Sequence, residues 1–232
     1  DLRADFERLL IKVDEAPVSV KYFNPVTEQE AVAEITRERV IEEVHVALLR
    51  VSPTSQLPLV IHEAAKGNFA PFVRMAVPKT APSPIAEAQY LSIVCSEETA
   101  FFTRDEAKAA AARTYPGMQF VDEFKAACNA WGVAPHKDYP LKWRKIDVPT
   151  LVISGDRDPI TPDEYGERIA GTLSNVRHLK IHRMPHDFSG LKGASCLDRI
   201  LLEFVDTKLP GSLDVSCVAK MSAPPFVLAM PE

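Results

Sequence analysis

The sequence lacks any apolar run of the roughly 18 residues that a membrane-spanning helix needs, so no membrane span is predicted. It also lacks an excess of basic residues, because 27 Lys and Arg stand against 32 Asp and Glu, for a net charge of -5. This charge gives no electrostatic reason to expect nucleic acid as a partner. With 46% hydrophobic residues among 232, the chain can bury a sizeable core.

Cysteines are few, and none has the spacing of a metal site. The sequence contains Cys95, Cys128, Cys196 and Cys217, with no C-x-x-C pair and no His at zinc-ligand spacing. We therefore predict no metal and no organic cofactor. The even number, with Cys217 in a polar tail, favours two disulfides and an extracellular or periplasmic location over four reduced core thiols. The sequence alone allows three pairings.

Residues 1–145 have mainly helical patterns, interrupted by a Pro-rich linker over 77–88. Predicted helices cover residues 2–13, 40–48, 57–66, 68–76, 105–115 and 118–131, where apolar residues recur at helical spacing or helix formers are dense. Two short runs, "VSVKYF" at 18–23 and "YLSIVC" at 90–95, are typical of strands. This part is therefore expected to be mostly helical.

Residues 146–232 show a different pattern. We predict a strand over 148–154, a helix over 161–169, a strand over 176–184 and a helix over 197–205. The first strand, "VPTLVIS", is continuously apolar, as in a strand buried on both faces of a parallel sheet. In the helix that follows, Thr161 is the expected N-cap, Pro162 the first helical residue and Glu164 the partner in a capping box. The fold class is therefore α/β.

Two polar residues stand where the predicted strands end: Asp158 in the turn after the first strand, and His186 just past the second. The carboxyl ends of neighbouring parallel strands lie side by side, so we expect Asp158 beside His186. A carboxylate that orients an imidazole is the acid and base part of a nucleophilic triad. Asp156, expected to stabilise the turn, and His182 are the nearby alternatives.

The same segments resemble a known family. "VPTLVISGDRDPITP", "HRMPHDFSG" and "CLDRILLEFVDTKLPGSLDVSC" are similar to the C-terminal end of an α/β-hydrolase, above all the secreted tripeptidyl-aminopeptidase-like branch related to proline iminopeptidases. That branch carries its acid in a G-x-x-D-P-[IV]-T-P turn, which matches Gly155 to Pro162 and implies that Asp158 is the triad acid. The family His usually follows a Gly, whereas His186 follows Pro185, a looser match.

The resemblance also implies pairings and a substrate contact. A cysteine pair flanks the final helix of that branch, which implies Cys196 with Cys217. "LSIVCSEE" and "ACNAW" resemble its lid, which suggests Cys95 with Cys128. In an aminopeptidase-like lid, Glu97 and Glu98 could hold the protonated substrate amine by charge pairing. A solvated acidic turn is the alternative reading of these two residues.

One expected motif is absent: the 232 residues contain no G-x-S-x-G nucleophile elbow. The nearest run, "GASCL" at 193–197, lacks the second glycine, and Ser195 is expected to be a helix N-cap. We therefore expect a lid in residues 1–145 and the C-terminal part of the core in 146–232, with the N-terminal portion of the hydrolase, which carries the serine, as a separate or unrecorded partner. The implied function is hydrolysis of peptide or ester bonds through an acyl-enzyme.

Two other interpretations stay open from the sequence. A hydrolase-like chain without a nucleophile could be a non-catalytic binding module. "DRDPIT" also resembles the D-x-D motif of haloacid-dehalogenase phosphatases, which bind magnesium, but that motif follows its strand immediately, whereas Gly155 intervenes here.

Overall fold

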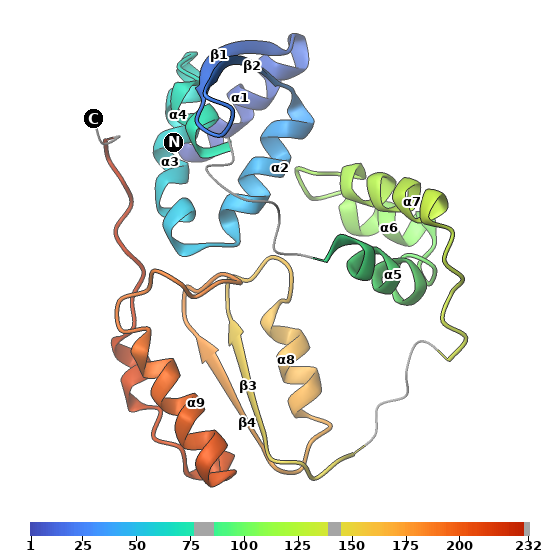
Figure 1. Ribbon diagram of the computed structural model, residues 1–232, viewed down its shortest axis with the longest axis vertical. Coiled ribbons are helices and arrows are strands. Elements are labelled where there is room, and N and C mark those ends of the chain that lie inside the picture. Colours follow the sequence, from blue (N-terminus) through green and yellow to red (C-terminus); the bar gives the residue numbers. More distant parts are fainter. Residues whose placement is uncertain (77–85, 139–144, 230–232) are drawn as a thin grey trace. The chain divides into compact units, whose positions relative to one another are not determined.

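The computed structural model describes residues 1–76, 86–138 and 145–229, which fall into two compact units (Figure 1). One unit comprises residues 1–23, 30–76 and 145–229, and the other comprises residues 24–29 and 86–138. Most of the expected Pro-rich linker lies outside the described residues. A lid role for residues 1–145 stays a prediction.

The part of the first unit before residue 77 contains the helices α1 (Leu2–Glu15), α2 (Arg37–Leu48), α3 (Val51–Lys66) and α4 (Ala70–Ala76). α1 packs against α3, and Leu9 and Val60 are completely buried. Gly67 adopts φ 102°, a left-handed conformation that only glycine takes readily, and so ends α3 at the predicted break.

A small two-stranded sheet pairs β1 (Val18–Asn24) with β2 (Gln29–Ile35). β1 was predicted and β2 was not. The inward residues of β2 are Ala31, Ala33 and Ile35, and two alanines give only a weak alternating signal.

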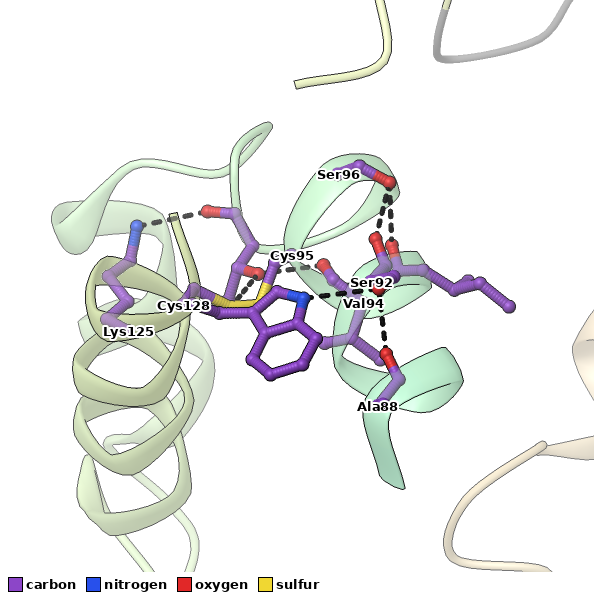
Figure 2. The surroundings of a disulfide bond; sticks show 10 residues. Ala88, Ser92, Val94, Cys95, Ser96, Lys125 and Cys128 are labelled. Atoms are coloured by element: carbon purple, nitrogen blue, oxygen red, sulfur yellow. Dashed lines mark hydrogen bonds between the residues drawn. A yellow bond between two sulfur atoms is a disulfide. The ribbon is translucent and has the colours of Figure 1, made fainter. Parts of the chain in front are cut away.

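The second unit contains α5 (Glu87–Glu97), α6 (Arg104–Ala111) and α7 (Gln119–Trp131). The prediction of a strand at "YLSIVC" is wrong, because this run lies within α5. Leu91, Val94 and Cys95 recur at helical spacing, and α5 packs against α7 through a disulfide from Cys95 to Cys128 (Figure 2). Ser92, near this bond, accepts a 3.1 Å hydrogen bond from Nε1 of Trp131.

The predicted strand, helix, strand, helix order is confirmed in the remainder of the first unit. The elements are β3 (Thr150–Gly155), α8 (Asp163–Ala170), β4 (Val176–Ile181) and α9 (Ser195–Thr207), followed by short 3-10 turns η1 (Pro210–Ser212) and η2 (Ser216–Lys220). β3 and β4 are parallel, with Thr150 opposite Val176 and Gly155 opposite Ile181. Leu179 and Ile181 pack against Ile200 of α9 in one core, and α8 contacts both strands.

The two expected N-caps are wrong. α8 begins at Asp163 after Pro162, and no side chain caps it, because the Thr161 hydroxyl donates to Asp158 instead. α9 begins at Ser195 itself. Its first turn is closed by backbone bonds from Cys196 to Gly193 and from Leu197 to Ala194, so a side-chain cap is not required there.

Candidate active site

The loops that follow β3 and β4 are fastened together by their backbones. The Asp156 amide donates to the carbonyl of Ile181 at 3.2 Å, which extends the parallel pairing by one residue. A Cβ on Gly155 would lie 2.3 Å from the carbonyl oxygen of Met184 and 2.5 Å from that of Pro185. Only glycine fits this close approach, so Gly155 lets the two loops meet.

Asp158 and His186 contact each other in these loops, as the strand order predicts. Nδ1 of His186 lies 2.8 Å from Oδ2 of Asp158, whose side chain is only 6% exposed. Oδ1 of Asp158 accepts the amides of Ile160 at 2.8 Å and Thr161 at 2.9 Å, and Oδ2 accepts the Thr161 hydroxyl at 2.7 Å. Each oxygen of this carboxylate therefore has two hydrogen-bond partners, which is about the number that an ionised carboxylate oxygen can accept.

These contacts keep the Asp158 carboxylate ionised. Burial raises its pKa, but hydrogen bonds from the backbone and hydroxyl of Thr161, from the Ile160 amide and from His186 outweigh burial, so the pKa of Asp158 is lowered from its ordinary value. An ionised acceptor at Nδ1 favours the imidazole tautomer that carries its proton on Nδ1. The other ring nitrogen is then an acceptor.

The His186 ring is hydrogen-bonded at Nδ1, whereas its Nε2 is open. Its side chain is 45% exposed, and the Thr161 hydroxyl lies 3.2 Å from Nδ1. In the part of the chain that the structure describes, Nε2 has no hydrogen-bond partner. The next residue is fixed, since the Asp187 amide donates to the carbonyl of Leu49 at 2.8 Å and the Asp187 carboxylate accepts both the amide and the hydroxyl of Ser189. The backbone around His186 is therefore anchored while Nε2 can accept a proton.

A second Asp–His pair lies beside the first. Oδ2 of Asp156 is 2.7 Å from Nδ1 of His182, but the His182 side chain is 74% exposed. Oδ1 of Asp156 accepts the amide of Arg183, which has φ 59°, so this carboxylate stabilises a left-handed turn. His178, further back in β4, hydrogen-bonds Ser154 at 3.0 Å.

The remaining candidates stand as follows. Glu97 is the last residue of α5 and Glu98 its C-cap residue, and their contact with a substrate amine stays a prediction. The structure joins Cys196 to Cys217 and Cys95 to Cys128, the pairs that the resemblance implies.

Among the described residues, no three His, Cys, Asp or Glu side chains gather closely enough to hold a metal ion. No helix of residues 1–76, 86–138 or 145–229 is long and apolar enough to cross a bilayer.

Thr161 is the site residue that sequence reasoning misplaced. Its hydroxyl and its amide both serve Asp158, three residues earlier in the chain. The signal was present, because Asp followed three residues later by Thr is the spacing of a local turn in which the carboxylate accepts main-chain and hydroxyl protons.

Comparison with known protein families gives a match to part of the chain. Residues 113–217 match the α/β-hydrolase family model described as TAP-like protein. No solved structure matches the chain significantly. The matched segment contains both Asp158 and His186, and this part of the chain is similar to the TAP-like branch of the α/β-hydrolase superfamily.

Proposed function

We propose that this chain supplies the acid and base of a serine hydrolase, with Asp158 as the acid and His186 as the base. The observation that carries the proposal is the 2.8 Å contact between Nδ1 of His186 and a buried, fully hydrogen-bonded Asp158, with Nε2 left open. Asp156 and His182 make a contact of similar length, but their greater exposure leaves that imidazole loosely held.

In the proposed reaction, Nε2 of His186 takes the proton of a serine hydroxyl as that oxygen attacks the substrate carbonyl. Asp158 holds the ring orientation and stabilises the imidazolium that forms. His186 then returns the proton to the leaving amine or alcohol, which leaves an acyl-enzyme. A water molecule, deprotonated by the same Nε2, hydrolyses this ester and restores the starting state.

Thr161 is a positioning residue in this scheme. Its hydroxyl donates to the same Asp158 oxygen that faces His186, and so fixes the direction of that oxygen. Its amide holds the second oxygen. Thr161 thus acts through Asp158 and does not need to touch a substrate.

The serine comes from polypeptide outside these 232 residues in this proposal, because the sequence contains no G-x-S-x-G elbow. We place it on an N-terminal portion of the hydrolase, with residues 1–145 shaping the substrate site as a lid. An aminopeptidase-like substrate, with Glu97 and Glu98 near its amine, is the favoured case, and an ester is the alternative. Two disulfides favour an extracellular or periplasmic setting.

The test is labelling of the purified protein with a fluorophosphonate probe, followed by a denaturing gel and intact mass measurement. We expect a second polypeptide to take the label, at a rate that His186→Ala or Asp158→Asn lowers by at least about 1000-fold. His182→Ala is the matched control and should label at close to the normal rate. Absence of any labelled polypeptide would refute the proposal and favour the non-catalytic binding module.

A further inference from the structure

A groove of about 910 Å³ runs along β4, and its lining includes neither Asp158 nor His186. Its lining contains residues 178–185 and no residue of β3, so it lies on the edge of β4 that faces away from β3. The other walls are Val51, Thr54 and Ser55 at the start of α3, and parts of the C-terminal segment between Val215 and Phe226. In Figure 1 this segment is the reddish trace that leads from the region of α9 to the C-terminus.

The β4 edge presents unpaired backbone groups to this groove. The amide of Thr150 donates to the carbonyl of Asn175, so the odd-numbered residues of this strand bond with β3. Successive residues of a strand direct their amides and carbonyls to opposite sides. The amides of His178, Lys180 and His182 and the carbonyls of His178 and Lys180 therefore point away from β3, and they have no hydrogen-bond partner within residues 1–76, 86–138 and 145–229. Such a row is a template for an added strand.

The chain's own C-terminal segment cannot supply that strand. Its two ends are fastened, since Ser222 exchanges backbone bonds with Lys192 and the Val227 amide donates to the carbonyl of Ser55 at 2.9 Å. Between these anchors lie Pro224 and Pro225, which have no amide proton to donate to β4. The segment therefore forms a wall opposite the strand edge and leaves the space between them open.

The lining of the groove is apolar with a basic end. Val218, Met221 and Phe226 contribute apolar surface, and none of the lining residues is acidic. Lys180 is already neutralised by carboxylates of α8, each 2.6 Å away. Arg183, directly beyond the end of β4, has a guanidinium without a partner in the described chain. At the carboxyl end of the strand, the Asp156 carboxylate is taken up by His182 and by the Arg183 amide, and the Arg183 guanidinium stays available for an anion.

We propose that this groove binds an extended apolar peptide that ends in a free carboxylate. The peptide would add parallel to the outer edge of β4, so that its backbone meets His178, Lys180 and His182 and its terminal carboxylate meets Arg183. Main-chain bonds to a strand edge supply affinity in this mode, and apolar side chains that alternate along the peptide fill the groove. A fatty acid could satisfy the apolar lining and Arg183, but it has no groups for the unpaired amides and carbonyls. The backbone edge therefore favours a peptide.

The test is a two-dimensional amide NMR titration of the full chain with the peptide acetyl-Val-Ala-Val-Leu bearing a free C-terminus. We expect saturable shifts of the His178, Lys180 and His182 amides. Amidation of the peptide C-terminus, or Arg183→Gln, should weaken binding about tenfold or more, since each removes a charge-assisted contact. Lys220→Gln, at an exposed lysine outside the groove lining, is the control and should bind normally.

A second pair of probes separates the peptide from a lipid. Methylation of alternate peptide nitrogens removes the main-chain donors without altering the side chains, and should abolish the shifts. Decanoate should not perturb the three amides of β4. The proposal is overturned if the unmodified peptide causes no saturable shift, if the methylated peptide binds as well, or if decanoate produces the same pattern.

Discussion

Replacing Thr161 by valine should loosen the turn that holds Asp158. Valine keeps the shape of threonine and the amide bond to Oδ1, but it loses the hydroxyl that donates to Oδ2 at 2.7 Å. A hydrogen bond to a charged group contributes about 1.5–3 kcal/mol, and the lower end applies because Thr161 is exposed. A loss of about 1.4 kcal/mol changes an opening equilibrium tenfold.

The assay for this change is amide hydrogen exchange at residues 160 and 161, whose amides donate to Asp158. We expect exchange about tenfold faster in Thr161→Val and close to normal in Thr161→Ser, which keeps the hydroxyl. The fluorescence of Trp131 would not report on this turn, because Trp131 lies in the unit of residues 24–29 and 86–138 and Thr161 does not. Unchanged exchange in the valine variant, or equal acceleration in the serine variant, would refute the assignment of the hydroxyl as a support for Asp158.

The effect of Thr161→Val should also depend on pH in a defined direction. The pKa of Asp158 is lowered in the folded protein, from an ordinary value of 3.8. Its stabilising contribution is therefore complete above that ordinary value and is lost as the pH falls through the folded value. The difference between threonine and valine should be largest near neutral pH and shrink below about pH 4. A difference that grew on acidification would show that the hydroxyl supports the protonated carboxyl instead.

Two further substitutions test the close contact of the two loops and the disulfide near α9. Gly155→Ala places a Cβ 2.3 Å from the Met184 carbonyl, so we expect a loss of about 2 kcal/mol or more in urea unfolding and weaker contact between Asp158 and His186. Gly211→Ala, where a Cβ would meet nothing within 4 Å, should be near neutral, and equal effects of the two would contradict the argument. Removing the Cys196–Cys217 bond by a double alanine substitution opens a loop of sequence separation 21, which should lower the free energy of unfolding by about 3 kcal/mol on the chain-entropy estimate. No change on reduction or substitution would show that the 3-10 turn at η2 is held by packing alone.

The sequence was sufficient for the elements around β3 and β4 because their signals are local and strong. A continuous apolar run predicts β3, and helical spacing of Leu197 and Ile200 predicts α9. The contact of Asp158 with His186 then follows from strand adjacency, since parallel neighbours bring the ends of their strands together. Register and handedness did not need to be known for that inference.

The run at residues 90–95 was predicted as a strand because its residues have high strand propensity. Its contacts with α7 stabilise a helix instead. Tyr90, Ile93 and Val94 have high strand propensity. The spacing of Leu91, Val94 and Cys95 fits a helix equally well, and packing on α7 with the bond to Cys128 decides between the two. A partner 33 residues away in the sequence is invisible to a window of local propensity.

The choice between the two adjacent Asp–His pairs rests on the number of hydrogen-bond donors around each carboxylate. That number is set by the fold and not by the local sequence. Asp156 and Asp158 are separated by one residue and each meets an imidazole at hydrogen-bond distance. Sequence spacing therefore cannot rank them. Asp158 gains three further donors because the chain turns back over it at Ile160 and Thr161, whereas Asp156 uses its second oxygen to hold the turn at Arg183. A carboxylate that is buried and fully hydrogen-bonded keeps its position when the neighbouring imidazole becomes charged. A catalytic base requires such a fixed partner.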